Sequence, residues 1–207
     1  MPEPPTVATI HWGSAGTLVL TSLVIMGSPG PATISLTAAG SAFGVRRSLG
    51  YLIGIIAGTA IVLVAVATGI TATLLAIPPM RSFLLGISAA YILWLAYRVA
   101  TAPPLAAQTE IARSPSLAGG ALLGVANPKA WVAIAAVFGS TRVADSPAAD
   151  AAAKVALLTV MIVVICATWL LAGATLAPLF RDPRRARIIN GVLAAALIAA
   201  TALAIFD

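Results

Sequence analysis

The sequence predicts an all-α integral membrane protein in which six transmembrane helices form two inverted three-helix repeats. Three observations lead to this prediction. Of the 207 residues, 60% are hydrophobic and 9% are charged, whereas a soluble domain carries about 25% charged residues. Six apolar runs are long enough to span a bilayer, which takes roughly 20 residues. The first run of each half contains a proline motif, so helices 1 and 4 are expected to be broken.

The six runs are separated by prolines and by short charged segments. Consecutive prolines remove backbone donors and end a helix, as at Pro78 and Pro79 after the second run. In chain order, the runs cover about residues 14–43, 49–77, 82–99, 117–139, 155–179 and 188–206.

The peptide Gly-Ser-Pro-Gly-Pro at 27–31 interrupts the first run. Pro29 and Pro31 lack N–H donors and clash with the preceding helical turn, and Gly30 weakens a helix further. In hydrocarbon the freed backbone groups need partners, so such a break is tolerated only against protein or a wet cavity. The alternative is a simple kink that serves packing alone.

A helix that restarts inside the membrane offers unpaired N–H groups and about half a positive charge, whereas the half that stops offers bare carbonyls. A zwitterionic amino acid could use both ends of such a break. We expect the N–H groups to come from Ala32, Thr33 and Ile34, with hydroxyls from Ser28, Thr33 and Ser35.

The second run carries glycines at four-residue spacing, which places Gly50, Gly54 and Gly58 on one helix face. Gly120 and Gly124 repeat the spacing just before the second break. Such faces let helix backbones approach closely in a membrane. They are expected to serve packing within the chain, and they also permit a homodimer.

Asn127-Pro128-Lys129 interrupts the fourth run and supplies the charge that lies deepest in any run. Placing a lysine inside hydrocarbon costs free energy, so such a residue is expected to have a functional role. Lys129 has three candidate roles: it contacts a substrate carboxylate, it neutralises the carbonyls of a half-helix, or it snorkels to the surface. Asn127 can bridge freed backbone groups as both donor and acceptor.

Pro29 and Pro128 are 99 residues apart, which is close to half the chain. Three spans in each half place the second half upside down relative to the first. Paired proline-interrupted segments in two such halves are the best sequence pointer to a transporter site. The proline-rich segment 101–116 is the predicted cytoplasmic linker between repeats 1–100 and 117–207.

The six runs contain no acidic residue. A proton relay would therefore need Lys129, backbone groups or water. Cys166, the single cysteine, lies in the fifth run and is expected to be a small buried residue. His11, the single histidine, lies beside Trp12 and is expected to anchor the chain at the membrane surface.

Cations are concentrated in the odd-numbered loops, which hold eight of them, whereas the even-numbered loops hold three. The positive-inside rule then predicts cytoplasmic odd loops, with both termini outside the inner (plasma) membrane. The eight are Arg46, Arg47, Arg98, Arg113, Arg181, Arg184, Arg185 and Arg187, and the three are Arg81, Arg142 and Lys154.

Several functional classes are disfavoured. The net charge of +6 comes from short loops between apolar runs rather than from a basic surface, so no nucleic-acid partner is expected. Hard metal ions need carboxylate oxygens, which the runs lack. A thiol redox carrier needs two cysteines, and Ser28 with His11 forms no hydrolase motif. We therefore expect no enzyme activity, cofactor or metal.

Four motifs, taken in order, resemble the lysine exporter (LysE/RhtB) family. They are Pro-Gly-Pro at 29–31, the glycine-stepped second run, Ala-Ala-Tyr-Ile-Leu-Trp-Leu at 89–95, and Asn-Pro-Lys at 127–129. The resemblance covers essentially the whole chain. It implies a six-helix inner-membrane exporter of amino acids or close relatives, driven by an ion gradient, with the proton as expected coupling ion. It also marks both proline motifs as site or gate residues.

Three positions depart from the family pattern. Ala32 stands where Asn or Asp is common, Thr59 where an Asp often follows the glycine, and Gly124 where Asn is common. Loss of these groups favours a neutral or apolar amino acid over a basic one, exported by alternating access. Export of another small metabolite, or a non-transporting role in lipid or glycolipid assembly, are the alternatives. The expected substrate-binding or gating residues are Ser28, Pro29, Gly30, Pro31, Thr33, Thr59, Asn127, Pro128 and Lys129.

Overall fold

The computed structural model describes residues 9–69 and 115–176 continuously, with scattered positions between 90 and 101 and between 178 and 199. The predicted third run, most of the predicted linker and the sixth run lie outside the continuously described residues.

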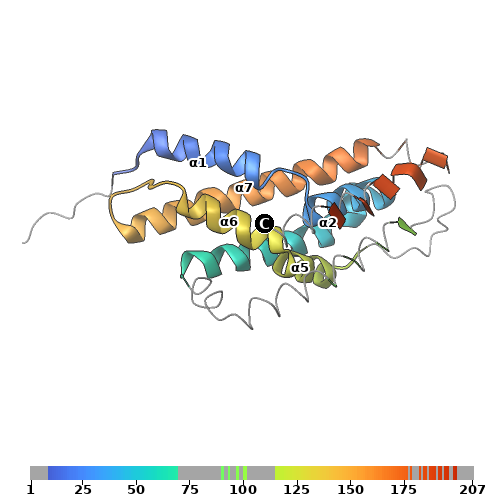
Figure 1. Ribbon diagram of the computed structural model, residues 1–207, viewed down its shortest axis with the longest axis horizontal. Coiled ribbons are helices and arrows are strands. Elements are labelled where there is room, and N and C mark those ends of the chain that lie inside the picture. The colour runs from blue at the N-terminus through green and yellow to red at the C-terminus, as the bar shows by residue number, and fades with distance from the viewer. Residues whose placement is uncertain are drawn as a thin grey trace, which may run out of the picture.

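The described residues form helices that run roughly along the long axis of the molecule (Figure 1). By length and composition, α2 and α7 can each cross a membrane, and the bent pair α5 and α6 can form a third span. The prediction of an all-α membrane protein is thus confirmed at this level. The helices are α1 (Trp12–Ile25), α2 (Pro31–Ala67), α5 (Leu117–Ala126), α6 (Pro128–Gly139) and α7 (Pro147–Leu176).

Helix α2 consists of two arms that meet at Gly44, where φ is 73° and ψ is 171°. A positive φ of this kind favours glycine. The Tyr51 hydroxyl donates to Ser35 Oγ at 3.1 Å across 16 residues, which would lie about 24 Å apart in a straight helix. The chain therefore folds back at Gly44. We call 31–43 the first arm and 45–67 the second arm; they belong to the predicted first and second runs.

The second arm packs on α5 through interdigitated glycines. A Cβ atom placed on Gly58 would lie 2.3 Å from the carbonyl oxygen of Ala121, and one placed on Gly124 would lie 2.7 Å from that of Ile55. The predicted close approach is thus confirmed. Gly50 lies on the face that the spacing predicts, but a Cβ atom placed there meets no described atom within 4 Å, so its expected packing role was wrong. The glycines in the contact are Gly54, Gly58, Gly120 and Gly124.

A second close crossing, which the sequence did not predict, joins the first arm to α7. A Cβ atom on Gly40 would lie 2.2 Å from the carbonyl oxygen of Leu170, and one on Gly173 would lie 2.1 Å from that of Thr37. The Thr37 hydroxyl also donates to the carbonyl oxygen of Trp169 at 3.3 Å. Helix α7 is thereby held against the chain that follows the first break.

Helix α7 begins eight residues before the predicted start, at Pro147. Asp150 and Lys154, which were assigned to a loop, therefore lie in the helix, where both are buried and form an ion pair at 2.8 Å. Asp150 also accepts the backbone N–H of Val143 at 2.6 Å. The Lys154 ammonium lies 5.1 Å from the ring centroid of Phe138, within the range of a cation–π contact.

Residues before α1 contact the turn between α6 and α7. The His11 N–H donates to the Val143 carbonyl at 2.9 Å, and Ile10 pairs with Ala144. Asp145 accepts a 2.6 Å hydrogen bond from the Thr9 hydroxyl and a 2.9 Å contact from His11 Nε2. These two hydrogen bonds hold the pKa of Asp145 below its ordinary value.

We expect Gly58→Ala to lower the free energy of unfolding by about 1–3 kcal/mol, because the new methyl group collides with the α5 backbone. Gly50→Ala is the matched control, since it lies in the same arm with no atom within 4 Å. That variant should gain about 0.5–1 kcal/mol from helix propensity. Thermal unfolding in detergent measures both, and equal losses would contradict the glycine contact.

Candidate functional site at the two helix breaks

The first predicted break is confirmed. Helix α1 ends at Ile25, and α2 begins at Pro31 with an extended Gly30 as its N-cap. Proline suits the first helical position because its ring presets φ and its missing N–H would have no partner there. Pro31, which belongs to the motif that interrupts the first run, therefore also starts the next helix.

The second predicted break is also confirmed. Helix α5 ends at Ala126 and α6 begins at Pro128, with a bend of 58° between them. Asn127 between them is extended, with φ −74° and ψ 106°. This conformation is expected for a residue before proline, because the proline ring excludes the helical region.

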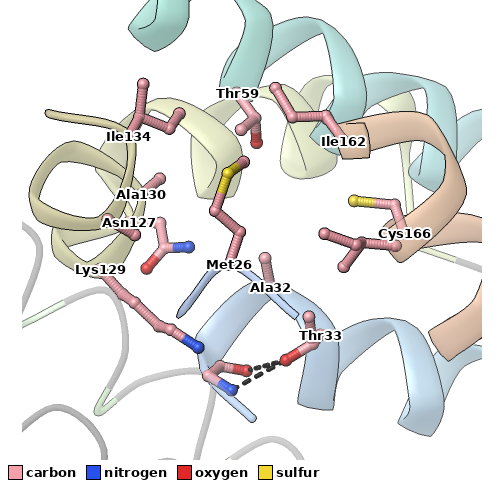
Figure 2. Close-up of a pocket in the computed structure, with 13 residues that line it drawn as sticks. Met26, Ala32, Thr33, Thr59, Asn127, Lys129, Ala130, Ile134, Ile162 and Cys166 are labelled. Atoms are coloured by element: carbon pink, nitrogen blue, oxygen red, sulfur yellow. Dashed lines mark hydrogen bonds between the residues drawn. The ribbon is translucent and has the colours of Figure 1, made fainter. Parts of the chain in front are cut away.

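Lys129 joins the two breaks. Its ammonium donates to the carbonyl oxygen of Ser28, to Ser28 Oγ at 2.7 Å and to the carbonyl oxygen of Pro29 at 3.1 Å. Figure 2 shows the side chain extending from α6 toward the first break. Gly30 leaves room for it, since a Cβ atom there would lie 2.6 Å from Lys129 Cδ. The ammonium of Lys129, a residue of the second break, thus neutralises carbonyls at the first break.

Two indole groups satisfy further carbonyls at the breaks. Trp169 Nε1 donates to the carbonyl oxygen of Gly27 at 3.1 Å, and Trp131 Nε1 donates to that of Val125 at 2.7 Å. Neither Trp131 nor Trp169 was among the residues predicted to lie at the site. The available signal was a tryptophan inside an apolar run, because a buried indole N–H needs an acceptor.

The N-terminus of the first arm is only partly capped. Thr33 Oγ1 accepts the N–H of Gly30 at 2.8 Å and donates back to its carbonyl at 3.0 Å (Figure 2). Ile34 donates its N–H to the Gly30 carbonyl at 2.9 Å, so the expectation of a free donor at Ile34 was wrong. The N–H groups of Ala32 and Thr33 have no partner among the described residues. The Ser35 hydroxyl donates to the carbonyl oxygen of Ala32 at 2.9 Å and accepts from the Tyr51 hydroxyl at 3.1 Å.

A small cavity of about 50 Å³ lies between the breaks, the second arm and α7. At about 10–15 Å³ per water molecule, it has room for roughly three to five waters. Its polar side chains belong to Thr33, Thr59, Asn127 and Lys129, and none of its described lining residues is acidic. The apolar lining consists of Met26, Ala32, Ala130, Ala133, Ile134, Ile162, Ile165 and Cys166.

Asn127 carries an unusual group. The residue is 5% exposed, and its Oδ1 is the buried side-chain polar atom that lacks a hydrogen-bond partner in the described part of the chain. Leaving such an acceptor unpaired costs about 1–3 kcal/mol, so it calls for an explanation. Thr59 is also buried, and Figure 2 shows its hydroxyl turned toward the same cavity.

The structure brings the predicted site residues of both halves together. Ser28 and Pro29 bind the Lys129 ammonium at the edge of the cavity. Pro31 and Pro128 open the two helices that restart there. The predicted residues that line the cavity are Gly30, Thr33, Thr59, Asn127 and Lys129.

Paired helix breaks that face one cavity in an apolar bundle are typical of membrane translocators. The family model described as LysE type translocator matches residues 23–206. The chain therefore belongs to the LysE translocator family, which confirms the resemblance inferred from the motifs.

Individual relatives match shorter stretches. An uncharacterized membrane protein of Vibrio cholerae is 32% identical over 124 residues, which is 58% of this chain and 60% of that protein. Cysteine/O-acetylserine efflux proteins of Salmonella choleraesuis and Salmonella typhimurium are each 40% identical over 83 residues, 40% of this chain and 42% of theirs. The chain thus spans about 40–60% of the length of these relatives. No solved structure matches.

Proposed function

We propose that the chain is a secondary transporter that exports small neutral amino acids across the inner (plasma) membrane by alternating access. The cavity between the two breaks carries this proposal. It offers hydrogen-bonding groups and an apolar wall but no described carboxylate. A basic side chain would enter it without a negative partner, which is costly in a low-dielectric site.

Lys129 supports the same preference. Its ammonium is already bound to oxygens of Ser28 and Pro29. The group therefore acts as a link between the halves, and in this conformation it closes the site rather than offering a free charge. Release of that link separates the breaks during alternating access, and each freed carbonyl then becomes available to solvent or substrate.

The named relatives point in the same direction. Cysteine and O-acetylserine, the substrates in the names of the Salmonella efflux proteins, are small neutral amino acids. Because the chain covers 42% of those proteins, their substrates enter here only as part of the proposal.

We extend the proposal to six spans in inverted repeats 1–100 and 117–207, joined by the cytoplasmic segment 101–116. The second arm and α5 run in the same direction, since Gly54 faces Leu117 and Gly58 faces Gly124. Two spans that run the same way need an odd number of crossings between them, and the sequence predicts one, at 82–99.

The contact of residues 9–11 with the turn after α6 supports the same topology. Four crossings return the chain to the side on which it started, and positive-inside bias makes that side external. We therefore propose that both termini lie outside.

The proton is the proposed coupling ion. The described cavity holds no carboxylate to carry it, which leaves Lys129, backbone groups or water. The glycine steps that would permit a homodimer are used within the chain, so they give a dimer no specific support. The exposed apolar side chains of α1 and α7 are suited to contact with lipid.

Efflux from cells tests the function. The chain is expressed in a bacterial strain that lacks its own exporters, the cells are loaded with dipeptides, and the released amino acids are measured. We expect faster efflux of at least one small neutral amino acid and unchanged efflux of lysine. Unchanged efflux of every amino acid would overturn the proposal, and faster efflux of lysine alone would overturn the neutral preference.

A further inference from the structure

We infer that the cavity binds the head group of a zwitterionic amino acid in one orientation. The α-ammonium donates to Asn127 Oδ1 at the second break, and the α-carboxylate accepts the N–H groups of Ala32 and Thr33 at the first. This inference rests on the proposed function and specifies which end of the substrate meets which break.

Asn127 is the residue that we expect to bind the α-ammonium of the substrate. Its Oδ1 is buried without a hydrogen-bond donor, and the residue lines the cavity, with the amide nitrogen on the cavity side in Figure 2. Rotation of the carboxamide about its terminal side-chain bond, which has a broad and roughly two-fold preference, exchanges the two atoms and presents Oδ1 to the cavity. A buried acceptor of this kind is satisfied by a ligand that brings a donor. An ammonium brings three, and its hydrogen bonds are stronger because the donor is charged.

The N-terminus of the first arm is the group that we expect to bind the α-carboxylate of the substrate. Ala32 and Thr33 both line the cavity, and their N–H groups have no partner in the described part of the chain. The start of a helix also carries a partial positive charge that favours an anion. The Lys129 ammonium, held at the carbonyls just before this helix, adds to that field.

The apolar lining of the cavity determines which substrate side chains can bind. Once the two charged groups are placed, the remaining lining includes Ile134, Ile162 and Cys166. These residues accept a small uncharged side chain and offer nothing to a cationic or anionic one. Both charged ends of the head group are therefore required for binding, whereas the side chain contributes mainly through its size.

Cys166 is a built-in reporter for this test. It is the single cysteine of the chain and it lines the same cavity. A methanethiosulfonate reagent added to the purified full-length chain should label it slowly, and a bound ligand should slow the labelling further. The probes are L-serine and L-leucine, each compared with analogues that lack one charged group.

For serine the analogues are ethanolamine, which lacks the carboxylate, and 3-hydroxypropionate, which lacks the ammonium. We expect serine and leucine to protect Cys166, with half-protection by either analogue of serine requiring at least about tenfold higher concentration. N-acetyl-L-serine should fail in the same way, because acetylation removes the ammonium. Equal protection by serine and 3-hydroxypropionate would overturn the inference.

Variants at Asn127 give a second readout. Asn127→Leu should weaken protection by serine at least about tenfold, because the acceptor is lost. Asn127→Asp should restore it and should also allow ethanolamine to protect. Thr159→Val is the control, since among the described residues the Thr159 hydroxyl donates only to the carbonyl of Val155 in its own helix. Unchanged protection in Asn127→Leu would overturn the inference.

The assigned orientation and the proposed function can be tested separately. If the wild-type chain exports amino acids but serine and leucine do not protect Cys166, the assigned orientation is wrong while the proposed function stands. If the chain exports no amino acid, the proposed function fails and the orientation falls with it. If Asn127→Leu does not fold, the analogue series on the wild-type chain decides the question alone.

Discussion

Lys129→Met is expected to reduce transport at least about tenfold while the chain still folds. The substitution keeps the apolar stem over Gly30 but removes the ammonium that binds Ser28 and Pro29. Two carbonyls of the first break then lose their donor, and each unpaired group costs about 1–3 kcal/mol. Because about 1.4 kcal/mol corresponds to a factor of ten, the state that joins the two breaks becomes much rarer. The initial efflux rate, normalised to the amount of folded protein, measures the effect.

Ser28→Ala provides a graded comparison. It removes one side-chain oxygen from the Lys129 ammonium and leaves both backbone carbonyls in place. We expect a loss clearly smaller than that of Lys129→Met, since a single hydrogen bond contributes about 0.5–1.5 kcal/mol. Full transport by Lys129→Met would show that the link between the breaks is unnecessary for function.

Asp150→Leu is expected to lower the free energy of unfolding by about 3–5 kcal/mol, because it leaves the buried Lys154 ammonium unpaired. It also removes the acceptor for the N–H of Val143. The stability can be followed by heating the protein in detergent with a thiol-reactive dye. Cys166 is buried and is the single cysteine, so the dye reports unfolding without an added label.

The double variant Asp150→Leu/Lys154→Met separates the cost of the unpaired charge from the other contributions of these residues to the free energy of unfolding. Removing both charges leaves no unpaired ion, so part of the lost stability should return. The contact of Lys154 with Phe138 and the cap on Val143 are not restored, and recovery should therefore be incomplete. If the double variant is no more stable than Asp150→Leu, the ion pair is not the source of the loss.

The positions of both breaks could be predicted because proline acts locally. Pro29, Pro31 and Pro128 each remove a backbone donor and clash with the preceding turn, so each favours a break or a kink whatever surrounds it. The glycine faces of the second arm and of α5 were predictable for a similar reason, since their spacing is visible along the chain, whereas their contact with each other was not predicted. Gly50 was included wrongly, because periodicity shows a face but cannot show where the neighbouring helix ends.

The partners of the freed backbone groups could not be predicted. Trp169 and Gly27 are 142 residues apart, and Lys129 and Ser28 are 101 residues apart. Nothing in local sequence pairs such residues. Two of the three roles weighed for Lys129 required a partner, and only the folded chain shows that the partner lies at the other break.

The predicted start of α7 lies eight residues too far along the chain, because the charged residues Asp150 and Lys154 were assigned to a loop. Asp150 and Lys154 are four residues apart, a spacing that places both on one face of a helix. Their mutual neutralisation lets them be buried in α7. A pair of opposite charges at this spacing beside an apolar run is therefore compatible with an extension of the helix.

Transport by the purified chain in liposomes tests the central claim, a site for neutral amino acids between the two breaks. Liposomes are loaded with radiolabelled L-serine, L-leucine or L-lysine, and release is followed with and without an imposed proton gradient. The account predicts faster release of serine or leucine than from protein-free liposomes or from liposomes with Lys129→Met, and no faster release of lysine. Release of neither neutral amino acid by a folded chain would contradict the account and would favour a non-transporting role in the membrane.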